Sequence, residues 1–108
     1  MKPIEFLGDA LAALRAFPEA ARRSAGFQLD RVQHGLEPLN WKPMTSIGPG
    51  VLEIRVREEG DAYRVLYVAR FPEAIYVIHC FPKKSRRTPQ HEMHVARRRL
   101  AGLMRFRR

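Results

Sequence analysis

Apolar side chains recur at helical spacing in the first third of the chain, in two separate stripes. The first stripe predicts a short helix capped by Asp9 and preceded by an edge strand over residues 3–7. The second predicts a longer helix that has Pro18 in its first turn and ends at Gly35, which permits a left-handed cap. The apolar positions are Leu7, Leu11 and Leu14 in the first stripe and Ala21, Ala25, Leu29 and Val32 in the second. We therefore expect a hairpin of two helices.

Strict alternation of apolar and polar residues replaces the helical spacing between residues 51 and 57. It predicts a strand with Leu52, Ile54 and Val56 on one face and Glu53, Arg55 and Arg57 on the other. Two further strands are predicted over residues 62–70 and 74–81, separated by short turns. The last strand has no polar break at residues 75–78, which is typical of a central strand covered on both sides.

The connecting segments complete the predicted fold. Residues 37–50 hold three prolines and two glycines, which predicts a long connection laid over the domain and held by Trp41 and Ile47. Thr88 and Pro89 predict the cap and first turn of a final helix. Its apolar stripe consists of Met93, Ala96, Leu100 and Leu103. The order β-α-α-β-β-β-α, in one domain over residues 1–108, predicts an α+β fold with a mainly antiparallel β-sheet.

Positive charge is concentrated in the last quarter of the chain. The 108 residues include 20 Lys and Arg against 11 Asp and Glu, which gives a formal net charge of +9. Residues 1–82 hold ten charges of each sign, whereas residues 83–108 hold ten cations and only one acid, Glu92. Because Lys83, Lys84, Arg86 and Arg87 follow a rigid strand, we expect a fixed cationic edge that attracts phosphates.

Several kinds of protein and site are not expected from this sequence. No apolar run approaches the roughly 20 residues of a membrane span, and charged residues interrupt residues 1–17, so we expect a cytoplasmic protein with no membrane segment. Cys80 is the only cysteine and lies in an apolar strand, which favours a buried, reduced thiol. His91 and His94 are three residues apart with no evident third ligand, so no metal or other cofactor is expected.

The polar side of the first long strand is the candidate site. Antiparallel pairing across a short turn brings Arg64 of the next strand beside Arg55 and Arg57. Lys83 and Lys84 leave the end of the third strand, so we expect these five cations to converge. Guanidinium groups hold phosphate oxygens through two parallel charge-assisted hydrogen bonds, and lysine adds a compact charge. The pattern therefore suits the binding of single-stranded RNA.

Plainer interpretations of the same residues stay open at this point. Arg55 and Arg57 also fit the solvated side of an amphipathic strand, paired with Glu53 or Glu58. Four aromatic residues are candidates both for stacking on unpaired bases and for the core of the sheet. They are Tyr63, Tyr67, Tyr76 and Phe81.

Four motifs occur together in an order and spacing that is far more specific than any one of them. They are GVLEIRVR at residues 50–57, AYRVLY at 62–67, YVIHCFPKK at 76–84, and the pair Thr88 and Pro89. With the helical hairpin before them, they resemble the phage-derived Gp49-like, HigB-type branch of the RelE/ParE toxin superfamily. The resemblance covers nearly the whole chain and implies the small RelE-like fold.

The resemblance also implies a function. Its members are toxins of type II toxin-antitoxin systems, each neutralised by a cognate helix-turn-helix antitoxin with which it can form a hetero-oligomer. Ribonuclease members enter the ribosomal A site and cut mRNA without a metal ion, which inhibits translation. The expected activity of this chain is therefore that of an endoribonuclease, or mRNA interferase, whose partners are the antitoxin, the ribosome and mRNA.

Site residues can be carried over from the family by motif position. Arg55 lies where relatives carry a basic strand residue, Arg64 where they carry a phosphate-binding arginine, and Lys84 at the basic end of the last strand. These three are the first candidates for catalytic residues. The candidates for further RNA contacts are Arg57, Lys83, Arg86 and Arg87.

The chain also departs from RelE itself, and the departures leave the proton-transfer groups open. RelE has a basic residue at the position of Glu53, and a tyrosine beyond its last strand where this chain has Thr88 and Pro89. Glu53 is a candidate base, and Lys84 is a second candidate for proton transfer. His79 is a third if its ring reaches the site, with a histidine of the sheet core as the alternative.

Two other functions remain alternatives to the ribonuclease. ParE-like proteins share the framework but inhibit DNA gyrase without being enzymes, and an inactive module would only bind RNA or an acidic antitoxin segment. Arg64 and the pair Lys83 and Lys84 favour the ribonuclease. The fold alone does not discriminate among the three.

Overall fold

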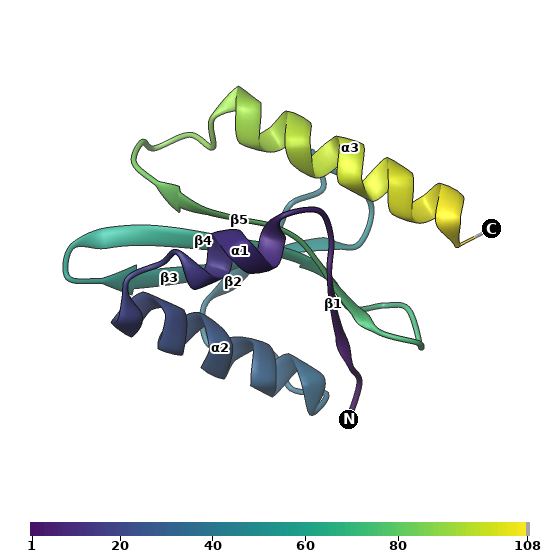
Figure 1. Ribbon diagram of the computed structural model, residues 1–108, viewed down its shortest axis with the longest axis horizontal. Helices are drawn as coiled ribbons and strands as arrows, with labels where there is room; N and C mark the ends of the chain where they lie inside the picture. The colour runs from purple at the N-terminus through teal and green to yellow at the C-terminus, as the bar shows by residue number, and fades with distance from the viewer. Residues whose placement is uncertain (108) are drawn as a thin grey trace.

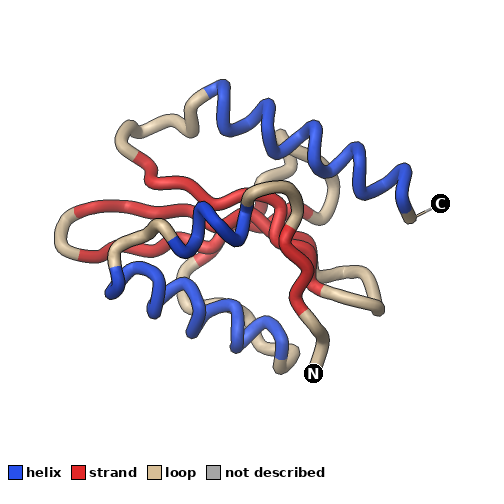
Figure 2. Tube along the Cα trace, viewed as in Figure 1, coloured by secondary structure: helices blue, strands red, loops and turns tan. Residues whose placement is uncertain are grey.

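The computed structural model describes residues 1–107. Its strands are β1 (Ile4–Phe6), β2 (Trp41–Pro43), β3 (Val51–Glu58), β4 (Asp61–Val68) and β5 (Ile75–Lys83), and its helices are α1 (Ala10–Arg15), α2 (Glu19–Gln33) and α3 (Gln90–Phe106). Figure 1 shows α2 on one side of the sheet and α3 on the other, and Figure 2 separates the helices from the strands by colour. The predicted α+β fold, with a helical hairpin first and a helix last, is confirmed.

A single five-stranded sheet organises the chain, in the order β1-β5-β4-β3-β2. Strands β2 to β5 pair with their neighbours in antiparallel fashion, whereas β1 lies parallel to β5. Every residue from Ile75 to Phe81 of β5 is buried. The prediction of a strand covered on both sides is therefore confirmed for β5.

The two faces of the sheet pack against different helices, after which we name them. The α1–α2 face contributes to a core that includes Ile54, Val56, Tyr63, Val65, Tyr67 and, from the helices, Ala10, Leu14, Ala21, Ala25 and Leu29. The α3 face contributes to a second core with Val51, Leu66, Val68, Ile78, Phe81 and, from the helix, Ala96, Leu100 and Leu103. Two apolar layers therefore enclose the central strands.

A bulge in β5 changes which residues point to which face. The register runs from Leu66 opposite His79 to Tyr67 opposite Val77, so that Ile78 has no partner on β4. Two residues therefore separate Val77 and Cys80 although both side chains belong to the core of the α1–α2 face. Beyond the bulge, Phe81 and Lys83 point to the α3 face, and Pro82 points to the other.

The connection between α2 and β3 contains a strand that the sequence pattern did not predict. Strand β2 pairs with β3, with Trp41 opposite Ile54 and Pro43 opposite Leu52. Proline is tolerated there because β2 is an edge strand, where one row of backbone groups has no partner to bond. Ile47 is buried in the connection as expected, whereas Trp41 is only half-buried.

The helix starts differ in detail from the predictions. Asp9 precedes α1 but makes no capping hydrogen bond, and its carboxylate instead binds Arg99 of α3 at 2.5 Å. Pro18 and Pro89 lie just before α2 and α3 in extended backbone, with ψ of 152° and 146°, so neither occupies the first helical turn and Thr88 is not the cap. Each proline disfavours helical backbone in the residue before it, so the helix does not extend further towards the N-terminus.

Three further expectations concern Cys80, metal sites and membrane-spanning segments within residues 1–107. Cys80 is buried as predicted, and burial raises the pKa of its thiol to about 12. No three His, Cys, Asp or Glu side chains in this range are grouped as they would be around a metal ion. None of the helices in it is long and apolar enough to cross a membrane.

Candidate functional site

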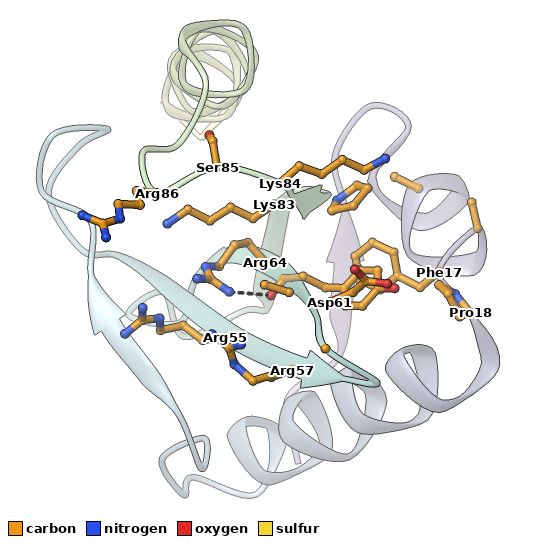
Figure 3. Close-up of a pocket in the computed structure, with 16 residues that line it drawn as sticks. Phe17, Pro18, Arg55, Arg57, Asp61, Arg64, Lys83, Lys84, Ser85 and Arg86 are labelled. Atoms are coloured by element: carbon orange, nitrogen blue, oxygen red, sulfur yellow. Dashed lines mark hydrogen bonds between the residues drawn. The ribbon is translucent and has the colours of Figure 1, made fainter.

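A hollow of about 1070 Å³ lies where β4 and β5 meet the loop before α3. Six cations line it, from β3, β4, β5 and that loop, and most of their side chains appear in Figure 3 pointing into the hollow. They are Arg55, Arg57, Arg64, Lys83, Lys84 and Arg86. Arg87 does not line the hollow and is exposed in the same loop.

The strand register explains how four of these cations come together. Arg55 lies directly opposite Arg64, and Arg57 and Lys83 lie on either side of Ala62 one row further along. All four occupy the α3 face, because directly opposed residues of antiparallel strands point the same way. Helix α3 packs on the apolar part of this face, so its cationic end stays open. We call Arg55, Arg57, Arg64 and Lys83 the cationic cluster.

Arg64 is the most enclosed member of the cationic cluster. Its side chain is only 7% exposed, its Nη1 donates a hydrogen bond to the carbonyl of Tyr63 at 3.1 Å, and its Nε lies 3.3 Å from Oε1 of Glu53. Burial lowers the pKa of Arg64, and the charge of Glu53 opposes this shift. Within residues 1–107, Nη2 of Arg64 binds no protein group, which leaves one arm of the guanidinium for a ligand.

Glu53, on the predicted polar face of β3 and a candidate base, is fully buried beneath these cations. Its Oε1 also lies 4.0 Å from Nε of Arg55, and neither carboxylate oxygen accepts a well-formed hydrogen bond. Lys42 of the unpredicted strand β2 lies opposite Glu53 in the sheet. Since like charges at opposed positions repel, the single carboxylate offsets the repulsion between Arg55 and Arg64.

Lys83, and not Lys84, completes the cationic cluster. Figure 3 shows the two side chains leaving the end of β5 in opposite directions, with Lys83 on the side of Arg64 and Lys84 on the side of Phe17. The bulge in β5 is the cause, because it moves Lys83 into the row of Arg57. Burial lowers the pKa of Lys83, and the neighbouring Arg64 lowers it further. Lys84 therefore lines the same hollow as the two arginines, as expected, but on its opposite side.

His79 lies away from the hollow, between β5 and α3. Its Nε2 lies 2.8 Å from Oε1 of Glu92, and Nη1 of Arg99 donates to its Nδ1 at 3.3 Å. Since a guanidinium only donates, Nδ1 accepts and Nε2 carries the proton that Glu92 receives as a hydrogen bond. Both ring nitrogens are thus engaged, and the ring packs against Phe81 with 5.3 Å between the centroids.

The aromatic residues of the strands belong to the core, which settles the alternatives for them. Tyr63, Tyr67, Tyr76 and Phe81 are each at most 7% exposed, so their rings are packed in the core, and of the four only Tyr63 borders the hollow. The structure instead adds a group that the sequence pattern did not single out at the far end of the hollow, where Phe17 and Pro18 join Pro82. The sequence could not show that these three residues line one end of the hollow, because residues 17–18 and 82 meet only in the folded chain.

The arrangement as a whole is suited to an anion. Four cations face one open hollow, one carboxylate below them is inaccessible to solvent, and within residues 1–107 Nη2 of Arg64 has no hydrogen-bond partner. Such a group binds a phosphate through charge-assisted hydrogen bonds that a neutral ligand does not provide. The interpretation of Arg55 and Arg57 as only a solvated strand face does not account for the hollow that they share with Arg64.

Comparison with known families agrees with this geometry. The sequence profile of the family described as phage derived protein Gp49-like (DUF891) matches residues 12–101 of the 108. No curated protein shows significant similarity to the chain. The matched region contains most of α1, all of α2, all the long strands and most of α3. The chain therefore belongs to the Gp49-like family, a family of toxin-antitoxin toxins that is related to RelE and HigB.

Proposed function

We propose that this toxin is a ribosome-dependent, metal-independent endoribonuclease that cuts mRNA and so inhibits translation. The observation that carries the proposal is the cationic cluster, in which four basic side chains face an open hollow above one buried carboxylate. A sugar-phosphate link placed there would meet positive charge on several sides. Family membership supports a toxin with a cognate antitoxin, for which we propose a helix-turn-helix protein.

The proposed reaction is an in-line displacement at phosphorus. The ribose 2′-hydroxyl gives up its proton to solvent water as its oxygen attacks the adjacent phosphorus, the bond from phosphorus to the 5′-oxygen breaks, and the products are a 2′,3′-cyclic phosphate and a 5′-hydroxyl. Negative charge grows on the two non-bridging oxygens during the attack. In this proposal Arg64 and Arg55, which are opposed on neighbouring strands and line the hollow, bind these oxygens, and stabilisation of developing charge by fixed donors is usually the largest catalytic effect.

Proton transfer is assigned to Lys83 in this proposal. The departing 5′-oxygen needs a proton, and Lys83 has a pKa lowered by burial and by Arg64, which makes its ammonium a better donor than a free lysine. The other candidates are already engaged. Glu53 is fully buried against Arg64, and His79 is held between Glu92 and Arg99.

The cations outside the hollow suit a ribosomal target. Arg87 and Arg98 are exposed on the loop before α3 and on α3 itself, away from the cationic cluster. A polyanion as large as the ribosome would be attracted by such charges, which raise the rate of association without taking part in the chemistry.

Mapping RNA ends in cells after brief induction tests the proposal. We expect discrete cuts in translated messages with the unaltered protein and, after so brief an induction, none above background with Arg64→Ala, which retains only slow residual cleavage. Because Arg64→Ala leaves Glu53 buried without its counter-ion, thermal unfolding must accompany the assay, and the half-buried Arg55→Ala serves as a second variant. Intact messages together with trapped gyrase–DNA complexes would replace the proposal by gyrase inhibition. Co-expression of the cognate antitoxin should restore growth.

A further inference from the structure

The hollow continues beyond the cationic cluster to a second part with different chemistry. Past the end of β5 it reaches the junction of α1 and α2, where apolar side chains form its wall. We call this wall the apolar lobe, which consists of Ala13, Ala16, Phe17, Pro18, Tyr63 and Pro82. Phe17 and Tyr63 pack on each other with 4.8 Å between ring centroids, so the lobe has a firm floor.

Two polar groups border the apolar lobe. Lys84 extends over it from the end of β5, on the side opposite to Lys83 (Figure 3). Asp61 lines the hollow from the start of β4, and burial together with the charge of Asp61 raises the pKa of Tyr63. The lobe therefore offers an apolar surface with a cation and a hydrogen-bond acceptor at its rim.

The size of the hollow leaves room for more than the cleaved link. Its volume is about 1070 Å³, whereas pockets for a drug-sized ligand span about 300–1000 Å³. The cationic cluster would be occupied by one ribose and one phosphate. The remaining space lies over the apolar lobe, next to the point where the RNA strand would leave the cationic cluster.

We propose that the apolar lobe is a nucleobase subsite, which takes the unpaired base of the nucleotide next to the cleaved link while Lys84 binds that nucleotide's phosphate. This inference rests on the proposed function, because it assumes that RNA passes through the hollow. A base of single-stranded RNA can turn out of the stack and lie against apolar side chains. Its N–H edge would meet Asp61, which as a carboxylate only accepts hydrogen bonds.

Charge favours a nucleotide over an apolar peptide segment as the occupant. The lobe is continuous with the cationic cluster, so any ligand that fills both parts must combine a flat apolar group with closely spaced negative charges. Successive nucleotides meet this requirement through base and phosphate. Lys83 and Lys84, adjacent in the chain but facing opposite parts of the hollow, would then bind two successive phosphates.

Binding of three uncleavable dinucleotides tests the proposal. All are 2′-deoxy compounds with terminal phosphates; one carries both bases, and each of the other two lacks the base at one position. Because they carry equal charge, the difference in their dissociation constants with the unaltered protein measures the base alone. We expect the intact compound to bind about tenfold more tightly than one of the abasic compounds, as base contacts are worth about 1–3 kcal/mol.

Two variants with matched controls locate the effect. Ala16→Leu places bulk in the apolar lobe and should abolish the preference for the intact compound, whereas Ala101→Leu on the exposed side of α3 should leave it unchanged. Lys84→Ala should weaken the intact and the abasic compounds equally, and Arg98→Ala should affect both less. Heteronuclear NMR shifts of Ala13 and Ala16 on titration report occupancy of the lobe directly.

The possible results separate this inference from the proposed function. Equal binding of intact and abasic compounds to the unaltered protein, including no binding of any, overturns the subsite. A preference that survives Ala16→Leu also overturns it. If the preference is found and is lost in Ala16→Leu while messages in cells stay intact, the subsite stands and the nuclease proposal fails.

Discussion

The two faces of the sheet are built by the same strands but differ in how far helices cover them. Helices α1 and α2 together seal the face that carries Ile54 and Val56, and the side chains there form a closed apolar core. Helix α3, with Met44 and Ile47 of the connection before β3, covers the apolar part of the opposite face and leaves Arg55 and Arg57 at the edge of an open hollow. Successive residues of β3 therefore serve stability and ligand binding in turn.

The comparison teaches how a small domain can hold four cations close together. Arg55 and Arg64 are directly opposed, which costs stability, and the buried carboxylate of Glu53 lies within 4.0 Å of both. Burial of the apolar side chains on the closed face stabilises the domain and offsets this repulsion. A face that carries repelling charges thus depends on the opposite face being well packed.

Substitution of the adjacent residues Ile54 and Arg55 on β3 should show the largest difference between the two faces. Ile54→Ala should lower the free energy of unfolding by about 2–5 kcal/mol, because a fully buried side chain is removed from a core that cannot collapse completely. Arg55→Ala should change it by less than about 1 kcal/mol while it reduces cleavage. Urea unfolding of both variants measures the difference. Equal losses of stability would show that the two faces are not divided as described.

Lys83 and Lys84, at the end of β5, allow the two faces to be compared through the effects of substitutions on kcat and KM. Lys83→Ala should lower kcat about 100-fold, since it removes the proposed proton donor from the cationic cluster. Lys84→Ala should raise KM with little change in kcat, because Lys84 faces the apolar lobe. Steady-state cleavage of a ribosome-bound message gives both constants. The reverse pattern would mean that the bulge does not place Lys83 in the site.

Neutralisation of the buried carboxylate sharpens the comparison further. Glu53→Gln keeps the size of the side chain but leaves the Nε of Arg64 without a charged partner, so the free energy of unfolding should fall by about 1–3 kcal/mol. RNA binding should become tighter at low salt, because the cationic cluster gains net positive charge. Urea unfolding and a salt titration of the dissociation constant check these results. Greater stability of Glu53→Gln would contradict the role of Glu53 as the counter-ion.

The smallest effect is expected at the far end of α3, away from the hollow. Arg107 and Tyr76 lower the pKa of Glu73 to about 2 from 4.5, through hydrogen bonds to its carboxylate. Because the folded-state pKa is the lower one, this stabilisation is complete above about pH 4.5 and is lost as the pH falls towards 2. Urea unfolding between these pH values should show a steeper decline for the unaltered protein than for Glu73→Gln. Identical declines would contradict the assigned contact.

Most of the fold could be predicted because its signals are local. The alternation over residues 51–57 and the stripes of α2 and α3 identify the elements without any knowledge of their neighbours. Strand β2 was missed because it is three residues long and contains Pro43, so neither alternation nor composition marks it. Its presence depends on pairing with β3, which no local pattern records.

The candidate site was predicted in part, and the errors have one physical origin in the geometry of the sheet. The resemblance and the strand pattern together identified Arg55 and Arg64, whose opposition follows from a short hairpin. The opposite placement of Lys83 and Lys84 in the hollow could not be predicted, because a bulge has no reliable sequence signature and reverses the side on which later residues lie. The burial of Glu53 depends likewise on β2 and on surrounding cations.

The central claim is that the cationic cluster holds the phosphate that is cut. Single-turnover cleavage on the ribosome, with one non-bridging oxygen of the scissile phosphate replaced by sulfur at a mapped site, tests it most directly. With the unaltered protein, we predict that one phosphorothioate isomer is cut at least about tenfold more slowly than the phosphate, and that this ratio falls close to one in Arg64→Ala. The same ratio in both proteins would show that Arg64 does not touch that phosphate and would contradict the account.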